Sequence, residues 1–293
     1  MPDTTQNTMQ YYTGQEIPVP GQQARTPSIT ERLIGWAFFL VITSLFIWMI
    51  INNIRRIYAS TLLTRKKTRL YVNGLLNMYF PYYQKLVSEK DRNRFVRRVI
   101  CFRRLKEFVF QDMEKSNDAC YFVSAAAIQL TFGLKSFRMP FFHTIHIING
   151  EYRHFAYATP FQGHVSGGQI YLSWPHFKYG YEQQDDSYNV GLHEMAHALA
   201  WQNYYTEDHH DTHFRRYFPE FSAAGRPLFQ RMQNGEQSLL GNYAAANYDE
   251  FWATSVEVFF EQPRKMKEEL PLLYAALCRL LNQDPGAMAA DRR

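Results

Sequence analysis

The longest uninterrupted apolar run in the chain lies near its start. Nineteen residues, Leu33 to Ile51, pass without one charged side chain. A core helix is rarely apolar all round over such a length, and a helix this long crosses a hydrocarbon layer of about 30 Å. We predict one transmembrane helix over 31–54. Residues 1–30 are rich in Thr, Gln, Pro and Gly and predict a flexible polar tail.

Positive charge follows the apolar run and orients it. The segment 55–70 holds six Lys or Arg residues, against Arg25 and Arg32 in the comparable stretch before the run. By the positive-inside rule, the side carrying this basic juxtamembrane linker is cytoplasmic. A cleavable signal peptide fits less well, because about thirty polar residues precede the run and arginines follow it. The run therefore predicts a retained single-pass anchor, with the lipid bilayer as partner of Leu33 to Ile51.

From residue 71 to 293 no repeat and no Gly/Ser-rich linker divides the chain, which predicts one domain. Helical periodicity marks a segment that begins at Ser88 with Asp91 in a capping pattern, and the segment DACYFVSAAAIQLTF after it. A third predicted helix, 189–204, has Asp186 or Ser187 as its N-cap. Strand-like segments occupy 141–148, 154–160 and 167–174. This order predicts an α+β domain with a small sheet.

Composition narrows the class of protein. With 46% hydrophobic and 16% aromatic residues the chain is not generally disordered. The net charge is +5, but much of the excess lies beside the predicted span, where it meets anionic lipid, so we expect no nucleic-acid partner. Three cysteines without a CxxC pair fit a reducing compartment, in agreement with a cytoplasmic domain.

Two histidines four positions apart form the clearest chemical motif. His193 and His197 flank Glu194 in the segment NVGLHEMAHALAWQNY. Positions i and i+4 lie one above the other on a helix, so both imidazoles can bind one zinc ion. Zinc lowers the pKa of a bound water to about 7, and Glu194 can then take the proton as general base. In a largely apolar helix a metal would satisfy all three groups together.

A third zinc ligand must come from elsewhere in the chain. The long motif HExxHxxGxxH is excluded, because Ala200 and Asn203 stand where it needs Gly and His. The predicted helix 247–262 offers three candidates, Glu250, Glu257 and Glu261. Spacing does not choose among them, and Glu250 also fits a capping box with Asn247. A second histidine group, His209, His210 and His213, lies among acidic and polar residues and is interpreted as a solvated loop.

The segments LHEMAHALA, GNYAAANYDEFWATSVEVFF and GGQIYLSW resemble the Mlc titration factor A family of bacterial zinc peptidases. The similarity runs from about Tyr82 to Pro263 and includes RNRFVRRVICF. The family pattern Tyr-Ala-Ala-x-Asn-x-x-Glu falls on Tyr243 to Glu250. The resemblance implies that the zinc ligands are His193, His197 and Glu250. It also implies that Glu194 is the catalytic base and that Tyr243 stabilises the transition state, as a phenol donor near an oxyanion would.

These observations together predict a zincin-like metallopeptidase domain over 71–293, with a small sheet beside the metal-binding helix and one Zn²⁺ per chain. The protein would cut peptide or protein substrates from the cytoplasmic side of the bacterial inner membrane, and the family implies aminopeptidase action. GGQIYLSW is a candidate strand for pairing with substrate backbone. The alternative is a non-catalytic protein that sequesters a regulatory protein at the membrane, and the intact Glu194 argues against it. A structural zinc fold is a further rival, but it would more often use cysteines.

Overall fold

The computed structural model describes residues 28–61, 66–152, 160–184, 186–206 and 210–288. Two compact units divide the chain, Met1–Asn53 and Ile54–Arg293. Helix α1 (Ile29–Thr61) begins with a reciprocal cap, in which Ser28 and Glu31 each accept a backbone N–H from the other. Its part Ile29–Arg55 is long and apolar enough to cross a membrane by length and composition, and none of its most apolar window is buried by protein.

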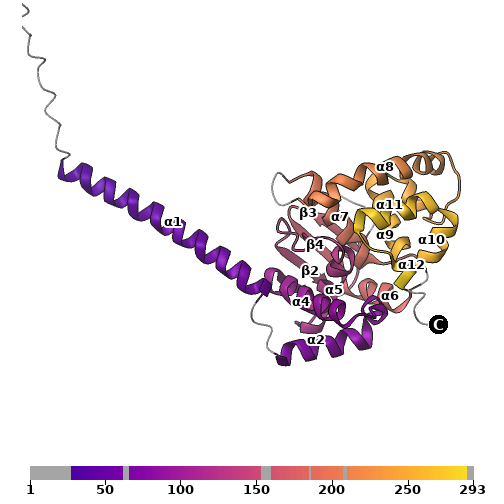
Figure 1. Cartoon of the computed structure of the whole chain (residues 1–293), viewed down its shortest axis with the longest axis horizontal. Helices are drawn as coiled ribbons and strands as arrows, with labels where there is room; N and C mark the ends of the chain where they lie inside the picture. The colour runs from indigo at the N-terminus through magenta and orange to yellow at the C-terminus, as the bar shows by residue number, and fades with distance from the viewer. Residues whose placement is uncertain (1–27, 62–65, 153–159, 185, 207–209, 289–293) are drawn as a thin grey trace, which may run out of the picture. The chain divides into compact units, whose positions relative to one another are not determined.

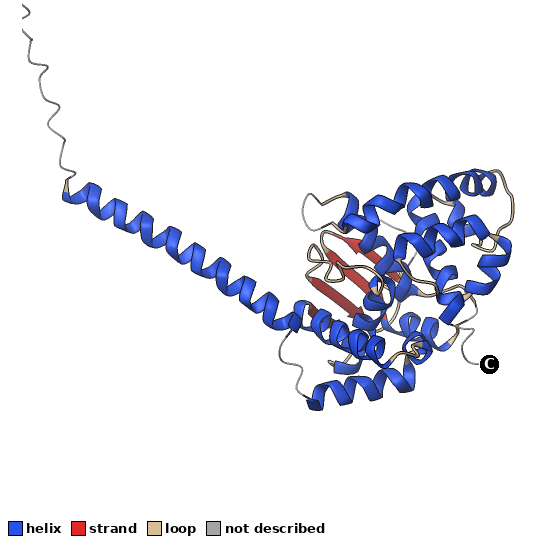
Figure 2. Cartoon of the chain, viewed as in Figure 1, coloured by secondary structure: helices blue, strands red, loops and turns tan. Residues whose placement is uncertain are grey.

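The second unit is mostly helical, with one small sheet (Figures 1 and 2). Its helices are α2 (Lys66–Tyr79), α3 (Pro81–Lys85), α4 (Glu89–Leu105), α5 (Asn117–Thr131), α6 (Trp174–Glu182), α7 (Val190–Tyr204), α8 (Thr212–Gln233), the 3-10 helix η1 (Asn242–Ala245), α9 (Tyr248–Glu261), α10 (Pro263–Glu269), α11 (Pro271–Leu281) and α12 (Pro285–Met288). The strands are β1 (Glu107–Gln111), β2 (Thr144–Ile148), β3 (Gly163–Ser166) and β4 (Gln169–Ser173). The predicted α+β class is confirmed. Residues 66–70, expected as part of a basic linker, already form the start of α2.

The sheet has the strand order β1-β2-β4-β3. β1, β2 and β4 run parallel, whereas β3 is antiparallel to β4. Gly167 and Gly168 join β3 to β4 with φ values of 55° and 75°, the left-handed backbone that a tight hairpin turn requires. Because β4 is paired on both sides, GGQIYLSW has no open edge, and its expected pairing with substrate was wrong. β3 holds the edge position instead. The predicted strand at 154–160 lies almost wholly outside the described residues.

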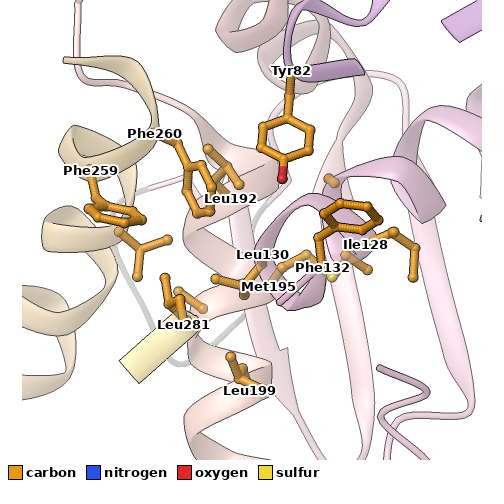
Figure 3. Packing of buried hydrophobic residues seen from close by; sticks show 14 of the residues in the cluster. Tyr82, Ile128, Leu130, Phe132, Leu192, Met195, Leu199, Phe259, Phe260 and Leu281 are labelled. Carbon is orange, nitrogen blue, oxygen red and sulfur yellow. The ribbon is translucent and has the colours of Figure 1, made fainter. Parts of the chain in front are cut away.

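Helix α7 runs through the hydrophobic core between α5 and α9. Leu192, Met195 and Leu199 of α7 are fully buried and lie in one cluster with Ile128 and Leu130 of α5 (Figure 3). Small residues on α5, Ala125 to Ala127, are also fully buried, which lets the two helices approach closely. The apolar positions around the two histidines therefore fix α7 as a rigid core element.

Short polar side chains set where the helices begin. The Ser88 hydroxyl accepts the Asp91 N–H at the start of α4, as predicted. The cap of α7 is Asn189, whose Oδ1 accepts the Leu192 N–H at 3.0 Å. The expected caps, Asp186 and Ser187, were wrong, because Ser187 has a left-handed φ of 63° and Asp186 closes a turn onto the Tyr188 N–H.

Candidate metal centre

Three predicted ligand atoms converge at one point between α7 and α9. The Nε2 atoms of His193 and His197, one turn apart on α7, lie 3.1 Å from each other. Glu250 Oε2 lies 2.9 Å from the Nε2 of His193 and 3.5 Å from that of His197. Among the described residues these three form the one group of metal-binding side chains with mutually close ligand atoms.

The distances fit a small cation. A point about 2 Å from all three atoms exists roughly 1 Å outside their plane, and zinc binds imidazole nitrogen and carboxylate oxygen at about this length. Glu250 Oε2 is buried and faces the Nε2 atoms of both histidines, so a cation would satisfy this oxygen when those two nitrogens carry no proton. The donor set of two nitrogens and one oxygen is that of a catalytic zinc site, which keeps a further position open.

Glu250 is placed by the first turn of α9. The Asn247 side chain caps this helix and accepts the N–H groups of Asp249 and Glu250 at 3.0 and 2.9 Å. The Glu250 carboxylate is turned toward the two imidazoles, so the sequence pattern that resembles a capping box positions a candidate ligand. Burial raises the pKa of Glu250, but hydrogen bonding to His193 and then His197 outweighs this and holds that pKa far below its ordinary value.

Glu257 lies on the other side of His193. Its Oε1 is 2.6 Å from His193 Nδ1, and its Oε2 accepts the backbone N–H of Asn189 at 2.5 Å. With the ring proton on Nδ1 and donated to Glu257, the lone pair of Nε2 points at the convergence point. Burial lowers the pKa of His193, but the charge of Glu257 and the hydrogen bond to Glu250 hold it well above the ordinary value.

The third glutamate considered from the sequence, Glu261, does not reach the histidines. Its Oε1 accepts a hydrogen bond from Asn189 Nδ2 at 3.0 Å. Burial raises the pKa of Glu261 to about 9. Asn189 thus links the start of α7 to both Glu257 and Glu261, a connection that the sequence analysis missed. The spacing of the three glutamates on α9 was visible in the sequence, but the side of the imidazole that each one faces was not.

Glu194 points into the same region from α7 without joining the triangle. The side chain is only 5% exposed, and its Oε2 has no hydrogen-bond donor. Burial raises the pKa of Glu194 to about 7. A Cβ atom on Gly163 of β3 would lie 2.4 Å from Glu194 Oε1, so only glycine leaves room for this carboxylate. Such a group can accept a proton near neutral pH and return it.

Tyr243 lies in η1 at the rim of the site. The residue is 61% exposed, and the centroid of its ring is 6.1 Å from that of the His193 ring. Burial raises the pKa of Tyr243 to about 12, with Glu250 as the next cause, so the phenol keeps its proton at neutral pH. The predicted oxyanion donor is therefore beside the metal triangle and protonated.

An open cleft of about 290 Å³ gives access to these groups. One wall is β3 with Gly163, His164 and Val165. Another is the C-terminal end of α7, where the mutually tilted rings of Trp201 and Tyr205 have their centroids 4.9 Å apart. Of the second histidine group, His209 lies outside the described residues. His213 lies in the first turn of α8 and bonds the Arg279 carbonyl oxygen at 2.7 Å, so it is structural, whereas a solvated loop had been expected.

Two comparisons relate the sequence of this chain to known proteins. Residues 53–281 match the model of the family described as glucose-regulated metallo-peptidase M90. Uncharacterized protein slr2042 of Synechocystis sp. is 23% identical over 231 residues, which cover 72% of this chain and 83% of that protein. The family match spans all the helices and strands of the site and confirms the resemblance to the Mlc titration factor A family. The chain belongs to the M90 family of glucose-regulated metallo-peptidases.

Proposed function

We propose that the protein is a membrane-anchored zinc peptidase with His193, His197 and Glu250 as the metal ligands. The observation that supports this most strongly is the triangle of ligand atoms, 2.9 to 3.5 Å apart, beside a buried carboxylate in an open cleft. Membership of a metallopeptidase family supports the same chemistry. A closed structural zinc site would not need the cleft or the fourth group, Glu194.

Zinc bound here would act as a Lewis acid toward a peptide carbonyl and would acidify water. Glu194 takes the proton from the attacking water and then delivers it to the leaving amine. Its burial suits both roles, because a pKa of about 7 lets the carboxyl exchange a proton at neutral pH. Tyr243 donates its hydroxyl proton as a hydrogen bond to the developing oxyanion.

The edge strand β3 is the proposed support for a substrate backbone. β3 and β4 form an antiparallel ladder, in which the N–H and C=O groups of every second residue point away from the partner strand. In β3 these residues are Gly163 and Val165, and both line the cleft. An extended peptide could pair there by strand addition. The aromatic pair Trp201 and Tyr205 offers a surface for a bulky apolar side chain.

Aminopeptidase action is the proposed mode of cleavage, as the family resemblance implies. Asp249 lies on the rim of the same cleft and could receive the α-ammonium group of a substrate. The cytoplasmic side of a bacterial inner membrane is the proposed location, because the basic residues follow the apolar helix. A C-terminal reporter that works only in the periplasm would contradict this orientation.

The experiment separates catalysis from metal binding. Glu194→Gln should retain about one zinc per chain while hydrolysis of a fluorogenic peptide falls by roughly 10² or more, the scale of a lost general base. Glu250→Gln should lose zinc on dialysis against a weak chelator, and Glu268→Gln, an exposed glutamate on α10, should behave like the wild type. A fully active Glu194→Gln protein would remove Glu194 as the base, whereas a wild-type protein that holds zinc but cleaves no peptide would favour the non-catalytic alternative, in which the domain only binds a regulatory protein.

A further inference from the structure

Helix α2 has an apolar face that no part of the described chain covers. Val72 and Leu76 are fully buried in the core, whereas Leu70 and Met78, on the opposite side of the helix, are 62% and 65% exposed. Gly74 lies between them on the same outward line, and a Cβ atom there would meet no atom within 4 Å. A helix that is apolar on its core-facing side and also on its outer side is expected to contact a second apolar environment, such as a membrane or another protein.

Tyr71 lies at the edge of this outward face and is 50% exposed. The Tyr71 hydroxyl donates a hydrogen bond to Asp118, so that ring has one polar end and one apolar face. Tyrosine side chains of this kind are enriched where membrane and water meet.

The stretch of sequence that contains α2 carries only positive charge. Between Glu31 and Glu89 the sequence has no acidic residue. Lys66 and Lys67 begin the helix with exposed side chains, and Arg69 follows them. A basic start followed by an exposed apolar stripe is the pattern of a helix that lies in the plane of an anionic membrane surface.

The chain also keeps α2 near a membrane. Ten residues separate Arg55, where the apolar span ends, from Lys66. A fully extended chain over that interval reaches about 40 Å at most. If the span is inserted, α2 therefore experiences a high effective concentration of lipid surface, and a weak interfacial affinity suffices to hold it there.

We propose that α2 is an interfacial helix that docks the peptidase domain onto an anionic phospholipid bilayer. Leu70 and Met78 enter the boundary between headgroups and acyl chains, and Lys66 and Lys67 contact lipid phosphates. This inference rests on the proposed membrane anchoring and is independent of the peptidase chemistry. It makes the domain a surface-bound enzyme and not one that hangs freely from its anchor.

The test uses the full chain in lipid nanodiscs of phosphatidylcholine, with or without phosphatidylglycerol. An environment-sensitive fluorophore is attached at Leu70→Cys or Met78→Cys, and at Leu272→Cys as a control, since Leu272 is 77% exposed on α11. The unsubstituted chain, labelled identically, gives the background from Cys278, the one native cysteine that is not buried. In anionic discs, labels at 70 and 78 should shift to the blue and resist iodide quenching, and the label at 272 should do neither.

A charge variant tests the lipid contact itself. Lys66→Gln with Lys67→Gln should weaken docking about tenfold or more, since each cation near an anionic surface contributes substantially. Lys115→Gln with Lys265→Gln removes the same charge from exposed positions elsewhere and should change nothing.

Three outcomes would overturn the proposal: equal quenching at 70, 78 and 272, protection that ignores both lipid charge and the lysine variant, or protection that grows with protein concentration in lipid-free detergent. The last would show that a second copy of the chain covers α2. A label at Ser44→Cys distinguishes failure of this inference from failure of the anchor, because it is protected in any disc that holds the span.

Discussion

Adding one methyl group to Gly163 should disable the site without emptying it. A Cβ atom there would lie 2.4 Å from Glu194 Oε1, 2.5 Å from its Cγ and 2.7 Å from its Cδ. Ordinary contact begins at 3.4 Å, so the carboxylate must move by about 1 Å. Gly163 does not have a positive φ, so alanine is otherwise compatible with its backbone. Displacement of a catalytic group by this much costs roughly 10² in rate, whereas overpacking costs about 1–3 kcal/mol of stability.

The assay for Gly163→Ala compares three quantities in one preparation. We expect kcat for a fluorogenic peptide to fall about 10²-fold. Zinc should stay near one per chain, because the added methyl group is directed at Glu194 and not at the three ligands. Ser166→Ala, an exposed position on the same strand, should keep full activity and serves as the control. A Gly163→Ala enzyme with normal kcat and normal zinc would refute the placement of Glu194 as the base.

Three further substitutions test the residues around the proposed metal position. Tyr243→Phe should lower kcat by roughly 10-fold or more with little change in KM or zinc, and an unchanged kcat would remove the phenol from the mechanism. Glu257→Gln should weaken zinc affinity about 10- to 100-fold in a chelator competition, less than Glu250→Gln does, and equal losses would mean that Glu257 is itself a ligand. Glu261→Gln should raise the urea midpoint at pH 8.5 but not at pH 5. Burial raises the pKa of Glu261 from 4.5 to about 9, so stability of the wild type falls as pH rises through that window. A midpoint difference independent of pH would contradict this.

The sequence correctly placed three candidate site residues on one helix. His193, Glu194 and His197 lie within one helical turn of one another, so their arrangement follows from helix geometry alone. The apolar run from Leu33 to Ile51 likewise predicted a helix, because length and composition suffice for that inference. Structural features that depend only on neighbouring residues in the sequence could thus be predicted from the sequence pattern.

The number of strands and their order in the sheet could not be predicted from the sequence pattern. β1 has only five residues and follows directly on the basic helix α4, so its alternation is too short to be distinguished from a helix end. β3 is shorter still, and the two glycines after it marked a turn without indicating its partner. Whether a strand lies at an edge depends on the order in which strands pair, which is a tertiary property. This is why the interior strand β4 was mistaken for the substrate-facing one.

The surroundings of each glutamate of α9 also depended on tertiary structure, as Glu250 and Glu257 illustrate. Glu250 and Glu257 are seven residues apart, two turns or about 10 Å along the helix, so they share one face. They reach opposite nitrogens of the same His193 ring because α9 crosses α7 with that ring between them. The buried Trp252 indole donates to the Ala196 carbonyl oxygen at 2.8 Å and ties the two helices together at this level. One carboxylate is thereby left facing the proposed metal position while the other contacts the far side of the ring, so the packing of two helices gives two identical side chains different surroundings.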